Sequence, residues 1–310
     1  MKFHLKHTIG IDSAFSPDAQ FLFNTAPHLR LQAGKGWQVF EYVESTRNII
    51  YARISFLIKG SEARSPMKAP FGSVEIYRKL TQKQVEEFVE QVEQQLRILA
   101  VKKIFIRHHP DCYDEKKPNV WRTCLRNLQF QQAIDITSII LVDDRSFEKK
   151  IKISERQKLH KAARVLTFER VNNIELKSIY AFIDACRKER NQSLSMTLTD
   201  LKKLLTVFPD RVLLFKVGAQ STLSAAAIVI LVSPKILYTF YYAHAKIHDR
   251  ISPVVFLLSG IYDFGRKHKI KMIDLGTSMT DQKLNKSLLH FKKSIGGISD
   301  NKSTFTKILI

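Results

Sequence analysis

Two charged residues near the end of the sequence have types and settings suited to carbonyl chemistry. Lys292 follows Phe291 in a segment with helical spacing. A fixed ammonium there could stabilise the oxyanion that develops when an amine attacks an ester or thioester, or it could be a solvated helix lysine beside Lys293. Asp274 ends an apolar stretch, where its carboxylate could accept a proton from an attacking amine or orient it. It could equally cap the turn at Gly276-Thr277-Ser278, and both pairs of alternatives stay open at this point.

An anion site is indicated upstream of Asp274. Tyr238 to Ala245 has strand character, Lys246 to Ser252 reads as a loop, and Pro253 stands at the first turn of a helix, where proline is tolerated. A strand that feeds a loop and then a helix N-terminus is a ready anion site. The predicted cofactor-binding residues are therefore those of this loop, namely Lys246, His248, Arg250 and Ser252.

Neighbouring aromatic residues in the same strand give a further candidate. Tyr241 and Tyr242 face opposite sides of a sheet, one toward a cleft and one toward the core. Filling the sheet is the simpler role for either ring. Tyr242 is retained as a catalytic candidate.

The first half offers fewer candidates. Arg64 and Lys68 flank a segment from Ala63 to Gly72 that contains two prolines, so it cannot be helical and should be an ordered loop or an edge segment. Their charges could hold a substrate phosphate or simply be solvated. His108 and His109, with Cys112 and Asp114, match no zinc-ligand spacing, and a loop that closes a strand explains them better. No metal site is expected.

The composition of the chain indicates what kind of protein carries these candidate residues. The chain has 310 residues, 45% hydrophobic and 25% charged, which is typical of a globular protein with a sizeable core. Three scattered cysteines and the absence of an apolar leader favour a cytoplasmic protein. Residues 1–150 hold 23 Lys+Arg against 17 Asp+Glu, and residues 151–310 hold 27 against 12, so the second half carries +15 of the net +21. Such a field attracts phosphate-bearing partners such as tRNA, coenzyme A or an anionic membrane surface; a solubility bias explains it as well.

Both halves show one order of elements: hairpin strands, a helix, a strand, a helix and a strand. In the first half, the hairpin is predicted at Trp37 to Val43 and Ile49 to Ile58, and the long helix begins after the N-cap Thr81. In the second half, three antiparallel strands are predicted before the helix that starts at Pro253. A basic helical join, Glu148 to Arg164, separates the halves. The pattern indicates a duplicated α/β protein.

The order of these motifs resembles the FemAB-like branch of the GNAT acyltransferase superfamily, whose members carry two GNAT-like domains in tandem. The segments that carry the resemblance are Ser65-Pro66, Ala69-Pro70-Phe71-Gly72, Arg156 to Ala162, Ser252-Pro253, Asp274-Leu275-Gly276, Asn285, Phe291-Lys292 and Ile295-Gly296. Each motif is weak, but their order and spacing are specific and span nearly the whole chain. The resemblance implies an α/β (α+β) fold of two GNAT-like domains, 1–150 and 151–310, each a mixed central sheet flanked by helices.

The resemblance also implies a function. Members of the branch transfer an aminoacyl group from aminoacyl-tRNA to a peptidoglycan precursor amine, or are described as acyl-CoA N-acyltransferases. By position, Lys292, Phe291, Asp274 and Tyr242 would lie at the reacting centre of a bacterial enzyme, in an inter-domain cleft. Arg64, Lys68, Phe71 and Asn285 would contact the substrate, and the donor would be acyl-CoA or aminoacyl-tRNA, with no metal. The partners would be an amine-bearing small molecule or precursor, and tRNA, with peripheral membrane contact only.

Two departures from the family pattern keep an alternative open. The stretch between Arg164 and Leu198 is too short for an inserted coiled-coil arm, and Lys246 to Ser252 contains no glycine of the kind found in a pyrophosphate loop. The alternative is a non-catalytic tandem-GNAT protein that binds RNA or a phosphorylated ligand through its basic C-terminal half.

Overall fold

The computed structural model describes residues 2–11, 18–114, 120–220, 222–280 and 282–309. Contacts between Cα atoms divide the chain into two units. The first is Met1–Ile136 together with Asp300–Ile310, and the second is Thr137–Ser299. The sequence placed one boundary after residue 150, whereas the unit boundary falls at 136/137 and the last eleven residues, 300–310, return to the first unit. The reason is strand pairing, which sequence order does not reveal.

The first unit is built on a mixed sheet with strand order β1-β2-β3-β4-β6-β15 and a short β5 paired with β3. Neighbours are antiparallel except β4 and β6, which are parallel. The strands are β1 (Phe3–Ile9), β2 (Trp37–Glu44), β3 (Ile49–Lys59), β4 (Glu62–Ser65), β5 (Glu75–Ile76), β6 (Lys103–Pro110) and β15 (Ile298–Ile308). The helices are η1 (Leu22–Asn24), α1 (Ala26–Gln32), α2 (Gln82–Ile98), η2 (Asp111–Tyr113) and α3 (Val120–Asn127).

The second unit has the strand order β7-β12-β11-β10-β9-β8. Only β11 and β12 are parallel; the other neighbours are antiparallel. Its strands are β7 (Gln131–Leu141, of which residues 131–136 belong to the first unit), β8 (Thr167–Val171), β9 (Val212–Ala219), β10 (Thr222–Ser233), β11 (Ile236–His244), β12 (Met272–Thr277) and the small pair β13 (Met279–Thr280) and β14 (Lys283–Leu284). Its helices are η3 (Phe147–Lys149), α4 (Ile153–Ala163), η4 (Asn173–Glu175), α5 (Leu176–Lys188), α6 (Leu198–Val207), η5 (Lys246–Ile251), α7 (Pro253–Lys267) and α8 (Lys286–Ser294).

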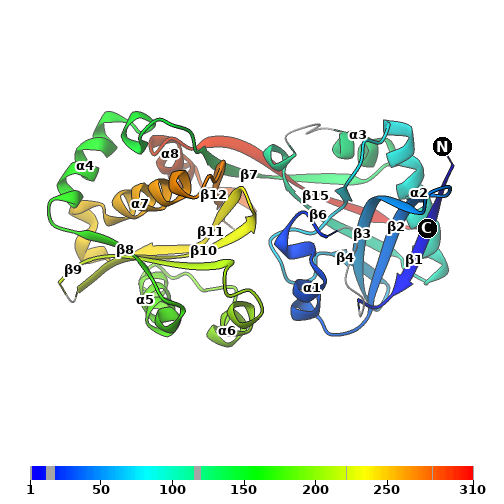
Figure 1. Ribbon diagram of the computed structural model, residues 1–310, viewed down its shortest axis with the longest axis horizontal. Coiled ribbons are helices and arrows are strands. Elements are labelled where there is room, and N and C mark those ends of the chain that lie inside the picture. Colours follow the sequence, from blue (N-terminus) through cyan, green and yellow to red (C-terminus); the bar gives the residue numbers. More distant parts are fainter. Residues whose placement is uncertain (1, 12–17, 115–119, 221, 281, 310) are drawn as a thin grey trace. The chain divides into compact units, whose positions relative to one another are not determined.

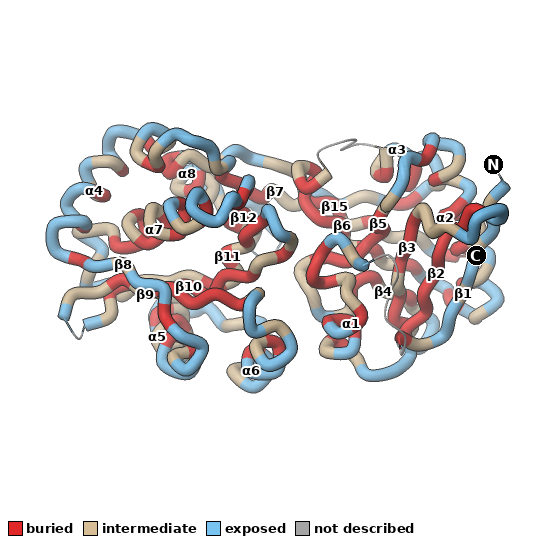
Figure 2. The backbone as a smooth tube through the Cα atoms, viewed as in Figure 1, coloured by how far each residue is buried: buried red, intermediate tan, exposed pale blue. Residues whose placement is uncertain are grey.

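Helices cover both faces of the second sheet (Figure 1): α7 lies along one face and α5 and α6 along the other. The core consists of the apolar sides of these layers, with Leu257, Leu258 and Ile261 of α7 packed against strand residues such as Ala227 and Val229. Figure 2 shows the same pattern, because buried stretches follow β10 and α7 while much of α4, α5 and α6 is exposed. In the described residues, no helix is both long and apolar enough to cross a bilayer.

Local signals in the sequence explain most of these elements. Thr81 forms the predicted N-cap of α2: its hydroxyl accepts from the Gln84 amide at 3.3 Å while the Gln84 side chain accepts from the Thr81 amide at 2.9 Å. The expectation for the segment 63–72 was partly wrong. Its first three residues complete β4, which pairs with β3 on one side and β6 on the other and is therefore an interior strand. The prolines stop that strand without placing it at an edge.

Candidate active site

The parallel strands β11 and β12 part inside the second unit. They pair at only three positions, Ile236 with Met272, Leu237 with Ile273 and Tyr238 with Asp274, although β11 continues to His244. Gly276 lies just past the last pair and has φ +74°, a left-handed conformation that residues with a side chain rarely adopt. The glycine thus lets β12 turn away from β11 where the pairing stops.

A cavity of about 560 Å³ occupies the region where the strands part. Its walls come from β11, the end of β12, the start of α7, and from α4, α5 and α8. All of its lining residues belong to the second unit. Because α5 and α7 lie on opposite faces of the sheet, the opening between the strands connects the two faces.

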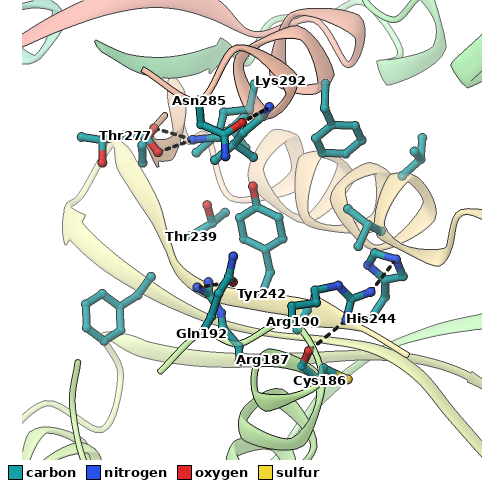
Figure 3. A pocket seen from close by; sticks show the side chains of 18 of the residues that line it. Cys186, Arg187, Arg190, Gln192, Thr239, Tyr242, His244, Thr277, Asn285 and Lys292 are labelled. Atoms are coloured by element: carbon teal, nitrogen blue, oxygen red, sulfur yellow. Dashed lines mark hydrogen bonds between the residues drawn. The ribbon is translucent and has the colours of Figure 1, made fainter. Parts of the chain in front are cut away.

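Lys292 lies at the inner wall of this cavity, from α8. Its side chain is buried, with 1% of the residue exposed, and its Nζ donates to the backbone carbonyls of Gly276 at 2.7 Å and Thr277 at 2.8 Å (Figure 3). Burial lowers the pKa of Lys292 to about 8, while the nearby Asp274 carboxylate acts in the opposite direction. An ammonium has three N–H groups, so two bind the carbonyls of the last two residues of β12 and one remains. The solvated-lysine alternative is therefore excluded.

Asp274 is buried and acts on the backbone. Its Oδ1 accepts from the Gly276 amide at 2.7 Å and from the Thr137 hydroxyl at 3.1 Å. This is the turn-capping alternative that the sequence left open, and Asp274 is not among the residues that line the cavity. Asp274 therefore positions the turn that Lys292 also binds.

Tyr242 and Tyr241 divide between the two faces of β11 as alternation requires. Tyr242 lines the cavity, and in Figure 3 its hydroxyl points toward the side where Lys292 and Asn285 lie. Burial raises the pKa of Tyr242 to about 12, so its phenol is neutral and can donate a hydrogen bond. Tyr241 is buried on the other face, where its hydroxyl contacts Ser195 Oγ at 2.6 Å and accepts from the Met196 amide at 2.9 Å.

The basic side of the cavity differs from the predicted one. Arg187, Arg190 and Lys158 line the cavity, from α5, the segment just after it, and α4. Arg190 donates to the Cys186 carbonyl at 2.9 Å and lies 3.3 Å from His244 Nε2. Together with Lys292, four cations and one carboxylate, Glu155, line the cavity. This charge suits an anionic ligand.

Of the four predicted cofactor-binding residues, only Ser252 lines the cavity. The loop folds as the short helix η5, in which the Lys246 ammonium donates to the Glu189 carbonyl at 2.6 Å and Arg250 is exposed. His248 is also outside the lining. The prediction for Lys246, His248 and Arg250 is therefore not supported at this cavity, because η5 directs these side chains elsewhere. A signal for the arginines did exist: Arg187 and Arg190 are three residues apart, on one face of a helix end.

The remaining candidates divide between the units. Phe291 and Asn285 line the cavity, and Asn285 also caps α8 through its Oδ1, which accepts from the Leu288 amide at 2.9 Å. In the first unit, Arg64 pairs with Glu62 at 3.0 Å and its guanidinium lies 4.0 Å from the centre of the Phe105 ring. Lys68 is exposed, and Phe71 is a buried core ring in edge contact with Phe21 and Phe23. A direct substrate contact by Phe71 would require this packing to open.

Comparison with known proteins places the fold in a class. No protein-family model and no curated protein sequence matches the chain. Among solved structures, the chain is similar to FemX, with a TM-score of 0.70 and 14% identity over 96% of this chain and 94% of that one. It is also similar to a tandem GNAT protein from the clavulanic acid biosynthesis pathway, with a TM-score of 0.56 and 7% identity over 98% of both chains. A third is L-PGS from Bacillus licheniformis, with a TM-score of 0.54 and 10% identity over 90% and 85%.

The chain therefore has a tandem GNAT fold. The fold is similar to that of FemX and of the tandem GNAT protein, in agreement with the expectation from the order of the motifs. At these identities, the comparisons establish the fold.

Proposed function

We propose that the protein is an acyltransferase that moves an acyl or aminoacyl group from an anionic activated donor to an amine, in the cavity between β11 and β12. The observation that carries this proposal is the cavity itself. One side presents the buried ammonium of Lys292 and the neutral phenol of Tyr242, and another presents Arg187, Arg190 and Lys158. Hydrogen-bond donors that meet a reacting carbonyl, beside cations that meet a phosphate, are what such a reaction needs.

The residues have separate tasks in this scheme. The acceptor amine forms a bond to the acyl carbon, and the carbonyl oxygen takes up negative charge. The carbonyl then re-forms as the bond to the leaving sulfur or oxygen breaks, and the proton of the amine passes to the leaving group, which departs as a thiol or a hydroxyl. The third N–H of Lys292 and the Tyr242 hydroxyl stabilise that oxygen. Asp274 and the two carbonyls bound by Lys292 hold the ammonium in place. Phe291 forms part of the apolar wall and Asn285 fixes the start of α8.

The cations of the cavity suit two classes of donor. Acyl-CoA and aminoacyl-tRNA both carry phosphates, and the arginines would bind either. The family resemblance adds a small-molecule or cell-wall precursor amine as acceptor and the cytoplasm as the place of reaction. We propose that the donor is bound by Arg187, Arg190, Lys158 and Ser252.

The direct test uses the purified chain with both donor classes. Transfer from acyl-CoA is followed by release of free thiol, and transfer from a charged tRNA pool by loss of the labelled aminoacyl ester, each with a panel of amines. We expect amine-dependent turnover with one donor class. If neither donor turns over and tRNA binds with a steep salt dependence, the catalytic proposal fails and the alternative of a non-catalytic RNA-binding protein is favoured.

The two tyrosines of β11 give a matched pair of variants. Tyr242→Phe is expected to lower kcat by about tenfold or more because a donor to the developing oxyanion is lost. Its unfolding free energy should stay unchanged. Tyr241→Phe should leave kcat unchanged but lower the unfolding free energy by about 1–2 kcal/mol, since the Met196 amide loses its partner. Steady-state kinetics and denaturant titration measure both; an effect of Tyr241→Phe on kcat with none from Tyr242→Phe would contradict the assignment.

A further inference from the structure

Two consecutive histidines in the first unit point to the same side of their strand. Side chains normally alternate along a strand, but β6 contains a bulge at this position. Lys302 of β15 pairs with Pro110, and Thr304 pairs with Arg107, so the two residues between them, His108 and His109, oppose a single residue of β15. Both histidines are buried and their ring centres are 3.9 Å apart. The bulge thus brings two imidazoles together.

Each imidazole is held through the same nitrogen. His108 Nδ1 lies 2.7 Å from Ser73 Oγ, and His109 Nδ1 lies 2.9 Å from the Pro110 carbonyl oxygen. A carbonyl oxygen can only accept, so His109 carries its proton on Nδ1 and leaves Nε2 with a free lone pair. Histidines that bind metals usually have this arrangement: one ring nitrogen donates a hydrogen bond that fixes the orientation of the ring, and the other nitrogen binds the ion.

The free nitrogens converge on one carboxylate. Asp114 Oδ2 lies 3.9 Å from His108 Nε2 and 3.7 Å from His109 Nε2, and all three ligand atoms lie within 4.8 Å of one another. Ligand atoms about 2.1 Å from a tetrahedral zinc ion are about 3.4 Å apart. Small side-chain rotations would therefore bring the three ligand atoms to the spacing that a zinc ion needs. The Asp114 side chain is 38% exposed, which gives an ion access from solvent.

Aromatic rings and charged side chains surround the two histidines. His109 packs against the rings of Phe21 and Tyr113. The charged neighbours are the carboxylates of Asp111, Asp114 and Asp300 and the cations of Arg122 and Lys302.

We propose that His108, His109 and Asp114 form a site for one divalent first-row transition-metal ion, with Zn²⁺ as its most suitable occupant. Two imidazole nitrogens and one carboxylate oxygen match the preferences of Zn²⁺ and leave a position open for water or a ligand. The site lies wholly in the first unit and is independent of the acyl-transfer proposal. Ser73 is its positioning residue, because it holds His108. This replaces the expectation from residue spacing that no metal binds.

The test uses the untagged full-length chain after removal of metal by a chelator. Co²⁺ should bind with one ion per chain and give the visible absorption of a low-coordinate site, and Zn²⁺ should displace it and raise the Tm. His108→Gln and His109→Gln should abolish the Co²⁺ spectrum. Asp114→Ala should weaken Zn²⁺ binding, measured against a chromophoric chelator, by about 100-fold, and Ser73→Ala by about tenfold.

Exposed residues supply the controls. Asp210→Ala and His290→Gln should leave both the spectrum and the affinity unchanged. Circular dichroism checks that each variant folds, and Asp114→Ala carries the test even if a buried histidine variant does not fold. The proposal is overturned if the wild-type chain gives no Co²⁺ spectrum, or if Asp114→Ala binds Zn²⁺ as tightly as the wild type does.

Discussion

Replacing Lys292 with methionine is expected to lower kcat/KM for acyl transfer by about 100- to 1,000-fold, the range found when a donor to a developing oxyanion is removed. Methionine keeps the length and apolar stem of the side chain and deletes the ammonium. The loss should appear mainly in kcat, because the interaction with the carbonyl oxygen strengthens only as charge develops. Lys293→Met is the matched control, since Lys293 is the exposed neighbour on the same helix. A Lys292→Met variant that retains wild-type turnover would remove Lys292 from the reaction.

Deprotonation of Lys292 is expected to lower the activity at high pH. Burial lowers its pKa to about 8 from an ordinary value of 10.5, so the ammonium loses its proton, and the oxyanion loses a charged partner, as the pH rises through 8. A decline in kcat above about pH 8 is expected. The effect on stability has the opposite sign: between pH 8 and 10.5, the unfolded chain holds a proton that the folded chain has released, so the unfolding free energy rises with pH in this window. Lys292→Met should lack this rise, which denaturant titrations at pH 7 and 10 would show.

Sequence reasoning succeeded where the signal was local. The cap at Thr81, the hairpin of β2 and β3, and the apolar face of α7 all follow from residues a few positions apart. The turn that Asp274 was expected to cap is present, because the Gly276 amide donates to the Asp274 carboxylate. Tyr241 and Tyr242 followed strand alternation. These features need no knowledge of the remaining chain.

The failures concern contacts distant in sequence. β15 pairs with β6, almost two hundred residues earlier, which the order of elements does not show. Loop chemistry suggested Lys246 and Arg250, but neither lines the cavity: the Lys246 ammonium donates to the Glu189 carbonyl and Arg250 is exposed. The closeness of the two histidines could not be predicted for a related reason: strand alternation separates His108 from His109, and the bulge that brings them together depends on the register of β15.

The second large effect is expected at the arginines. The double variant Arg187→Ala/Arg190→Ala should raise KM for the donor by about 100-fold while changing kcat little, because each charge-assisted hydrogen bond to a phosphate is worth about 1.5–3 kcal/mol. Such bonds form in the ground state and persist through the reaction, so they act on binding. Raising the salt concentration should weaken donor binding to the wild type more than to the variant.

A control variant with the same loss of charge distinguishes direct binding of the donor from long-range electrostatic attraction. Lys177→Ala/Lys188→Ala also removes two positive charges from α5, but both side chains are exposed and neither lines the cavity. If the arginines bind the donor directly, only their variant raises KM strongly. Equal effects from both double variants would mean that the basic surface merely attracts the donor over distance, and the binding task would then return to other residues of the cavity. The two outcomes thus decide whether Arg187 and Arg190, at the end of α5 and just after it, bind the donor in place of a glycine-rich phosphate loop.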